Sequence, residues 1–148
     1  MTGEPVIILY IEDEPAHAEI AIRNLAMCRI ANKVVHLSDG QEALDYLFRQ
    51  GKFCDPSASP RPHLILLDLR LPKVDGIDVL TKIKSDSELK KIPVVILTTS
   101  AAEADLTKAY INNVNSYLVK PLSFEKFSEL LETFGFYWLA WNQYPDKN

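Results

Sequence analysis

Charged and hydroxyl side chains stand at the ends of several apolar runs in this sequence. Glu12 and Asp13 follow the first run, and Asp68 closes a run of four aliphatic residues. Thr98 ends a later run, and Lys120 follows the last one. An isolated carboxylate is costly to bury, so an apolar strand that ends on one needs a physical reason. Together the carboxylates could bind a divalent cation, beside a hydroxyl and an ammonium group.

Three carboxylates meet if the strands that end at Glu12 and at Asp68 are neighbours. Two carboxylates about 4 Å apart repel by roughly 4 kcal/mol at an effective dielectric of about 20. A hard divalent cation removes this repulsion, and proteins commonly hold Mg²⁺ with a few carboxylates while it keeps several waters. We therefore expect Mg²⁺ as cofactor, with Mn²⁺ able to replace it, and Lys120 as a further positive charge.

Five apolar runs predict five strands, at residues 6–11, 33–37, 64–69, 94–98 and 116–119. Three of them are almost entirely Val, Ile and Leu, which is typical of central parallel strands covered on both faces. Helical patterns lie between the runs. Pro15 suits a first helical position, and residues 38–41 and 100–103 fit capping boxes. Alternating strands and helices predict a doubly wound α/β domain, in which ligands bind beyond the carboxyl ends of the strands.

Composition and charge exclude several classes of protein. The chain has 148 residues, which favours one domain, and its net charge of −4 argues against a nucleic-acid surface. No apolar run approaches the ~18 residues of a membrane span, and the N-terminus lacks the basic region of a signal peptide. Cys28 and Cys54 match no metal spacing, so we expect reduced thiols in a cytoplasmic protein.

Four motifs carry a resemblance that spans essentially the whole chain: IEDE (11–14), LLDLRLPKVDG (66–76), LTTS (97–100) and YLVKP (117–121). In this order, each at a predicted strand end, they resemble the receiver domain of two-component response regulators. The resemblance implies a flavodoxin-like (βα)5 fold with a five-stranded parallel sheet in the order 2-1-3-4-5. It also implies a phosphoprotein that carries an aspartyl phosphate in phosphorelay signal transduction.

The resemblance implies a role for each acidic residue. Asp68 would accept a phosphoryl group from a sensor histidine kinase. Asp13, Asp68 and the backbone carbonyl of Arg70 would bind Mg²⁺ directly, and Glu12 would act through a bound water. Glu12 stands where the family more often has Asp, which preserves the charge and gives a longer reach. Asp39 and Asp75 are more simply interpreted as turn or helix-cap residues.

The resemblance assigns the phosphoryl-binding residues to the last two strands. Thr98 would bind a phosphoryl oxygen, and Lys120 would pair with the charge of the same group. Tyr117 occupies the position of the family's aromatic switch. The peptide bond between Lys120 and Pro121 would be cis, an isomer that proline makes accessible.

An aromatic C-terminal extension, residues 135–148, follows a receiver domain predicted at residues 1–134. We expect no output domain, so the signal would pass by binding to another protein. Four aromatic residues are candidates for a homodimer or partner interface: Phe134, Tyr137, Trp138 and Trp141. The alternative is that this extension packs against the domain's own surface. The pattern is similar to the response regulators of bacterial phytochromes, so the kinase could be a bacteriophytochrome.

Two rival functions remain as alternatives, an interaction module and a phosphatase, and a third is excluded. A receiver-like interaction module would act without phosphate, but it would lack one of the acting residues, and none is missing. An aspartate-nucleophile phosphatase of the haloacid dehalogenase type needs a second Asp two residues after the nucleophile, where this chain has Arg70. A nucleotide- or flavin-binding domain needs a Gly-rich loop after the first strand, and none is present. We therefore expect a signalling protein rather than an enzyme.

Overall fold

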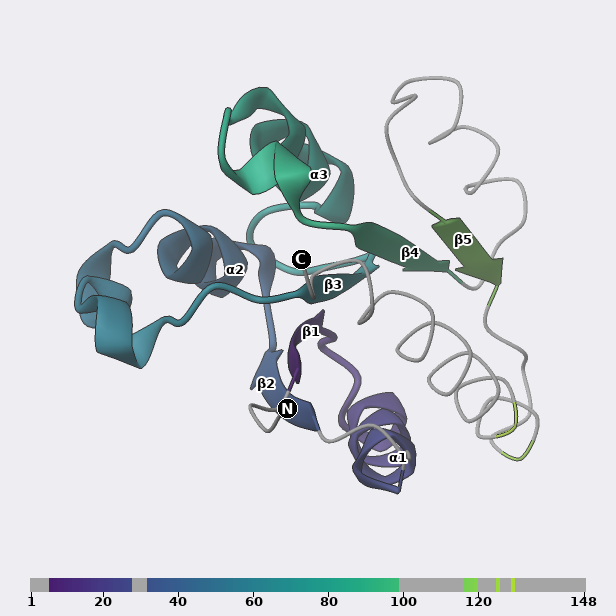
Figure 1. Ribbon diagram of the computed structural model, residues 1–148. Helices are drawn as coiled ribbons and strands as arrows, with labels where there is room; N and C mark the ends of the chain where they lie inside the picture. Colours follow the sequence, from purple (N-terminus) through teal and green to yellow (C-terminus); the bar gives the residue numbers. More distant parts are fainter. Residues whose placement is uncertain (1–5, 28–31, 99–115, 120–124, 126–128, 130–148) are drawn as a thin grey trace.

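The protein folds as a parallel sheet with helices on both faces. The computed structural model describes residues 6–27, 32–98, 116–119, 125 and 129. Its five strands are β1 (Val6–Ile11), β2 (Asn32–Leu37), β3 (Leu64–Asp68), β4 (Val94–Thr98) and β5 (Ser116–Val119). All neighbouring strands are parallel, and the sheet order is β2-β1-β3-β4-β5 (Figure 1). The predicted flavodoxin-like fold and its strand order are confirmed.

Helices cover the two faces of the sheet. The helix α1 (Pro15–Ala26) lies on one face, and α2 (Gly40–Leu47) and α3 (Gly76–Ser85) lie on the other (Figure 1). Three 3-10 turns complete the described elements: η1 (Gly51–Phe53), η2 (Pro56–Ala58) and η3 (Leu89–Lys91). Among the described residues, no helix is both long enough and apolar enough to cross a membrane.

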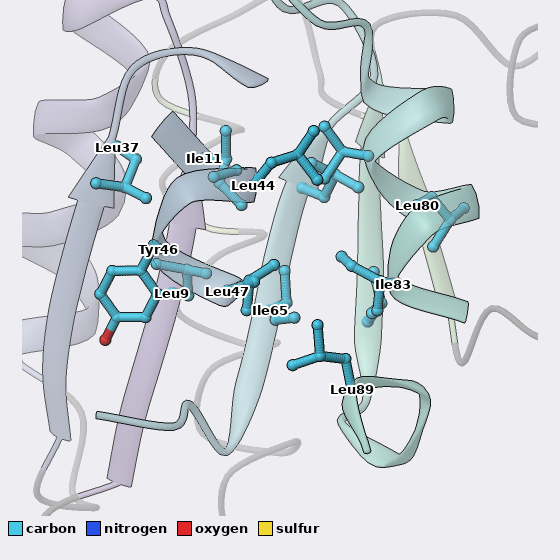
Figure 2. Packing of buried hydrophobic residues seen from close by; sticks show 14 of the residues in the cluster. Leu9, Ile11, Leu37, Leu44, Tyr46, Leu47, Ile65, Leu80, Ile83 and Leu89 are labelled. Carbon is cyan, nitrogen blue, oxygen red and sulfur yellow. The ribbon is translucent and has the colours of Figure 1, made fainter. Parts of the chain in front are cut away.

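Alternate residues of the central strands supply two separate cores. Leu9, Ile11, Ile65 and Leu67 pack with α2 and α3, as Figure 2 shows for the larger cluster. Their neighbours in sequence, including Ile8, Tyr10, Leu64 and Leu66, pack with α1 on the other face. Because successive side chains of a strand point to opposite faces, both sets are apolar and the runs show no alternation. All five residues of β3 are buried, Asp68 included.

Two helix starts show what the sequence patterns specify. Pro15 occupies the first turn of α1, as predicted, and the Glu14 side chain accepts a hydrogen bond from the Ala16 backbone N–H. The cap of α2 lies one residue later than the predicted box. Asp39 is the N-cap and accepts from the Glu42 N–H at 2.8 Å, while Glu42 accepts from the Ser38 N–H at 3.0 Å. The interpretation of Asp39 as a cap is confirmed.

The segment between α2 and β3 is held more firmly than a simple surface loop. Residues 51–62 contain η1 and η2, and the Tyr46 hydroxyl donates a 2.6 Å hydrogen bond to the Pro60 carbonyl. Arg61 donates to the Leu47 carbonyl at 2.8 Å, and Ser59 is fully buried. Tyr46 packs its ring into the core while its hydroxyl points away from the surrounding leucines (Figure 2). Side-chain hydrogen bonds to backbone carbonyls therefore attach this loop to the domain.

Candidate functional site

A cluster of carboxylates lies at the carboxyl end of the sheet. The strands β1 and β3 are neighbours, with Tyr10 paired to Leu66 and Ile11 paired to Leu67. Continuing this register by one residue places Glu12 opposite Asp68, about 5 Å away across the parallel pair. One carboxylate oxygen from each of Glu12, Asp13 and Asp68 lies within 4.8 Å of the others. The structure thus brings the three predicted carboxylates together.

The burial of this cluster makes its charge difficult to accommodate. Glu12 is 1% exposed and Asp68 is 7% exposed, while Asp13 is open to solvent. Two carboxylate charges about 5 Å apart repel by roughly 3 kcal/mol at an effective dielectric of about 20. Hard oxygen donors with an exposed side for water are the ligands that Mg²⁺ and Mn²⁺ prefer. The donor set therefore fits a divalent cation of this class, although the role of each ligand stays a prediction.

Both oxygens of the Glu12 carboxylate accept hydrogen bonds. The Tyr10 hydroxyl donates to Oε1 at 3.2 Å, and the Glu14 backbone N–H donates to Oε2 at 3.2 Å. The Glu12 backbone is held as well, because its N–H donates to the Leu37 carbonyl at 3.0 Å and its carbonyl accepts from His36 Nε2 at 2.8 Å. Glu12 is therefore fixed through side chain and main chain.

Tyr10 is a site residue that sequence reasoning missed. Its side chain is fully buried, and burial raises the pKa of its hydroxyl far above the ordinary value, with Glu12 and then Asp68 adding to the shift. The spacing of Tyr10 and Glu12 in the sequence could have indicated this contact. Residues two apart in a strand share a face, so Tyr10 and Glu12 were bound to point to the same side of the sheet.

The turn after Asp68 closes tightly over the end of β3. The Arg70 backbone N–H donates to Asp68 Oδ1 at 3.0 Å, and the Gly76 N–H donates to the Leu69 carbonyl at 3.0 Å. A Cβ atom at Gly76 would lie 2.5 Å from the Asp68 carbonyl oxygen and 2.6 Å from Leu69 Cα. Only glycine fits there without displacing the backbone that carries Asp68.

The remaining predicted residues are placed less completely. Thr98 ends β4, one residue past Leu97, which pairs with Asp68. Tyr117 lies in β5 and pairs with Ile96. The side chains of Thr98 and Tyr117 are not described. Lys120 and Pro121, with their predicted cis bond, lie outside the described residues, as do Phe134, Tyr137, Trp138 and Trp141. Their predicted roles stay predictions.

Fold and site together define the class of protein. Residues 8–132 match the model of the response regulator receiver domain, and the chain belongs to this family. Receiver-domain response regulators are signalling proteins, and the resemblance recognised in the sequence is confirmed.

Within this family, the chain is similar to several individual response regulators. The chain is 46% identical to the probable methanogenesis regulatory protein FilR2 of Methanothrix harundinacea, over 96% of this chain and 89% of the relative. It is 40% identical to the response regulator Rcp1 of Synechocystis, over 93% and 92% of the two chains. Among solved structures, the phosphorylated cyanobacterial phytochrome response regulator RcpA matches with a TM-score of 0.84 and 38% identity, covering 93% of this chain and 96% of RcpA. The predicted similarity to phytochrome response regulators is confirmed.

Proposed function

We propose that this protein accepts a phosphoryl group on Asp68 from the phosphohistidine of a sensor histidine kinase. The observation that carries the proposal is the cluster itself. Asp68 ends a fully buried strand, with carboxylate oxygens of Glu12 and Asp13 within 4.8 Å. In the transfer, the bond from phosphorus to the histidine nitrogen breaks and a bond to an Asp68 oxygen forms. The strand supplies rigidity, which fixes the in-line geometry that phosphoryl transfer needs.

Asp13, Asp68 and the Arg70 carbonyl are the proposed direct ligands of the cation, with Glu12 acting through a water. When bound, Mg²⁺ or Mn²⁺ offsets the clustered negative charge and stabilises the charge that develops on the phosphoryl oxygens. The solved structure of Rcp1 with bound Mn²⁺, 40% identical to this chain with a TM-score of 0.83, supports a divalent cation here. Arg70 already lies close, since its N–H donates to Asp68 Oδ1.

Thr98 and Lys120 are the proposed partners of the transferred group, through a hydrogen bond and an ion pair. Moving a two-state equilibrium from 1:99 to 99:1 takes roughly 5.5 kcal/mol. Two hydrogen bonds to a charged group supply about 3 to 6 kcal/mol. The upper part of this range reaches the free energy that a full switch requires, so phosphorylation can shift Tyr117 and a binding surface with little to spare.

The output that we propose is protein binding or dimerisation through the aromatic extension, residues 135–148, together with Phe134 before it. Phe134, Tyr137, Trp138 and Trp141 are the candidate contacts. The similarity to RcpA supports a bacteriophytochrome as the kinase. The higher identity to FilR2 supports a kinase of another pathway. Phosphotransfer assays with a kinase of each kind distinguish the two. Because such kinases use ATP, the cytoplasm is the proposed compartment.

Incubation with Mg²⁺ and acetyl phosphate, followed by intact mass measurement, tests the proposal. We expect the wild type to gain one phosphoryl group, and we expect no gain in Asp68→Asn or in wild type with EDTA. Size measurement on the same samples then tests the proposed dimer. A gain in Asp68→Asn equal to that of the wild type would show that another residue is the acceptor.

A further inference from the structure

Tyr10 and Glu12 form a pair whose members lie two residues apart at the end of β1. The Tyr10 hydroxyl donates to Glu12 Oε1 at 3.2 Å, and both side chains are almost completely removed from solvent. Both point to the face of the sheet that α1 covers, because residues i and i+2 of a strand share a face. The hydroxyl is therefore aimed at one end of the carboxylate cluster.

The ring of Tyr10 cannot easily move. It belongs to the core cluster that includes Ala18, Ala21 and Leu25 of α1, and it contacts the His36 ring at a centroid distance of 5.8 Å. His36 in turn donates to the Glu12 backbone carbonyl at 2.8 Å. A packed ring with a fixed hydroxyl is a rigid donor, so the position of Oε1 follows from the core packing.

A glutamate needs such a donor more than an aspartate does. Its extra methylene adds a rotatable bond, and a carboxylate on a longer stem has more orientations to lose. The Glu14 N–H donates to Oε2 and restrains that end of the carboxylate. The Tyr10 hydroxyl donates to the other oxygen, Oε1, so the two donors hold the carboxylate at both ends.

We propose that Tyr10 is a positioning residue that fixes the Glu12 carboxylate toward the divalent cation of the cluster. The inference rests on the proposed function only for the presence of that cation. Tyr10 and Glu12 then act as one unit. In Glu12→Asp the carboxylate retracts by about 1.5 Å, the length of one carbon–carbon bond, and leaves the reach of the hydroxyl.

Mn²⁺ binding without a phosphodonor tests the pair, with free Mn²⁺ followed by electron paramagnetic resonance. The proteins are the wild type, Tyr10→Phe, Glu12→Asp and the double variant. Outer partners of metal ligands typically contribute about ten- to hundredfold in affinity. Because Glu12 acts through a water, we expect Tyr10→Phe to weaken Mn²⁺ binding by about tenfold, the lower end of this range. We expect the same substitution to have no effect in the Glu12→Asp background.

Tyr46→Phe is the matched control. It also removes a buried tyrosine hydroxyl that donates to an oxygen, the Pro60 carbonyl, but on the opposite face of the sheet. We expect its Mn²⁺ affinity to equal that of the wild type. Thermal unfolding of each variant without metal shows whether it folds. If Tyr10→Phe does not fold, the tyrosine ultraviolet difference spectrum on adding Mn²⁺ to wild type and to Glu12→Asp replaces it, with a change expected only in wild type.

Three results would overturn the inference. Wild-type affinity in Tyr10→Phe would show that the hydroxyl does not position Glu12. An equal loss in the wild-type and Glu12→Asp backgrounds would show that the hydroxyl acts independently of Glu12. An equal ultraviolet difference spectrum in wild type and in Glu12→Asp on adding Mn²⁺ would likewise show that the hydroxyl acts independently of Glu12. An absence of Mn²⁺ binding by the wild type would instead overturn the cation part of the proposed function, and this inference with it.

Discussion

Glu12 lies opposite Asp68 at the ends of adjacent parallel strands, one residue beyond the pair that Ile11 forms with Leu67. This register brings two largely buried carboxylates together, and Asp13 adds a third at the solvent side. The carboxylates repel one another in this arrangement, and a bound divalent cation would offset that repulsion.

Removing one charge from the cluster should stabilise the protein in the absence of metal. In Asp68→Asn the Oδ1 atom can still accept from the Arg70 N–H, while the repulsion from Glu12 and Asp13 is lost. We expect a gain of about 1–2 kcal/mol in the free energy of unfolding by urea in EDTA, a part of the Coulomb estimate.

Added Mg²⁺ should also stabilise the protein, and the wild type more than Asp68→Asn. At about 100 times its Kd, Mg²⁺ should stabilise the wild type by roughly 2.7 kcal/mol, and Asp68→Asn by clearly less. Urea unfolding curves for both proteins, with and without Mg²⁺, check this. Equal stabilisation of both proteins would contradict a role for Asp68 in binding the cation.

Gly76→Ala should damage the site through the backbone. The new Cβ would meet the Asp68 carbonyl oxygen at 2.5 Å and Leu69 Cα at 2.6 Å, so the end of β3 must shift. We expect a loss of stability of about 1–3 kcal/mol, the usual range for overpacking, and slower phosphorylation by acetyl phosphate.

Gly51→Ala is the control for this substitution. Gly51 has a φ of +58°, so alanine is strained there by about 1–2 kcal/mol, but it lies in η1 and belongs to neither β1 nor β3, whose ends carry the carboxylate cluster. Its phosphorylation rate should equal that of the wild type. If the two variants lost stability and rate in the same proportion, the effect of Gly76→Ala on the rate would reflect stability alone.

Alkaline pH should destabilise the protein in a way that depends on Tyr10. Burial, followed by Glu12, raises the pKa of this hydroxyl above its ordinary value of 10.0. The folded state therefore retains a proton that the unfolded state loses above about pH 10, so the stability contribution is complete below pH 10 and falls as the pH rises further.

Urea unfolding between about pH 9 and pH 11 measures this contribution. Each unit above pH 10 should cost the wild type about 1.4 kcal/mol more than Tyr10→Phe. Parallel pH profiles for the two proteins would mean that the Tyr10 hydroxyl ionises as readily in the folded state as in the unfolded one.

Tyr46→Phe should loosen the loop at residues 51–62 without disturbing the site. The substitution removes the 2.6 Å hydrogen bond to the Pro60 carbonyl and keeps the ring in its cluster. We expect about 0.5–1.5 kcal/mol of lost stability and faster amide hydrogen exchange in this loop. Unchanged exchange there would show that Arg61 and Ser59 hold the loop without Tyr46.

The strands and the carboxylate cluster could be predicted because the sequence encodes them locally. Continuous apolar runs specify strands buried on both faces, and a parallel sheet brings Glu12, Asp13 and Asp68 to one edge. The hydrogen bond from Tyr10 to Glu12 was not predicted, because Tyr10 lies within an apolar run and was interpreted only as part of a buried strand. The anchoring of residues 51–62 depends on hydrogen bonds from Tyr46 and Arg61 to backbone carbonyls 14 residues away, which leave no periodic pattern.

The most direct test of the account identifies the residue that carries the phosphoryl group. Protein treated with acetyl phosphate and Mg²⁺ is reduced with borohydride, which converts an aspartyl phosphate to homoserine, and its peptides are then sequenced by mass spectrometry. The account predicts homoserine at position 68 and unmodified aspartate at position 13. Homoserine at position 13 or at any other aspartate, with Asp68 intact, would contradict it.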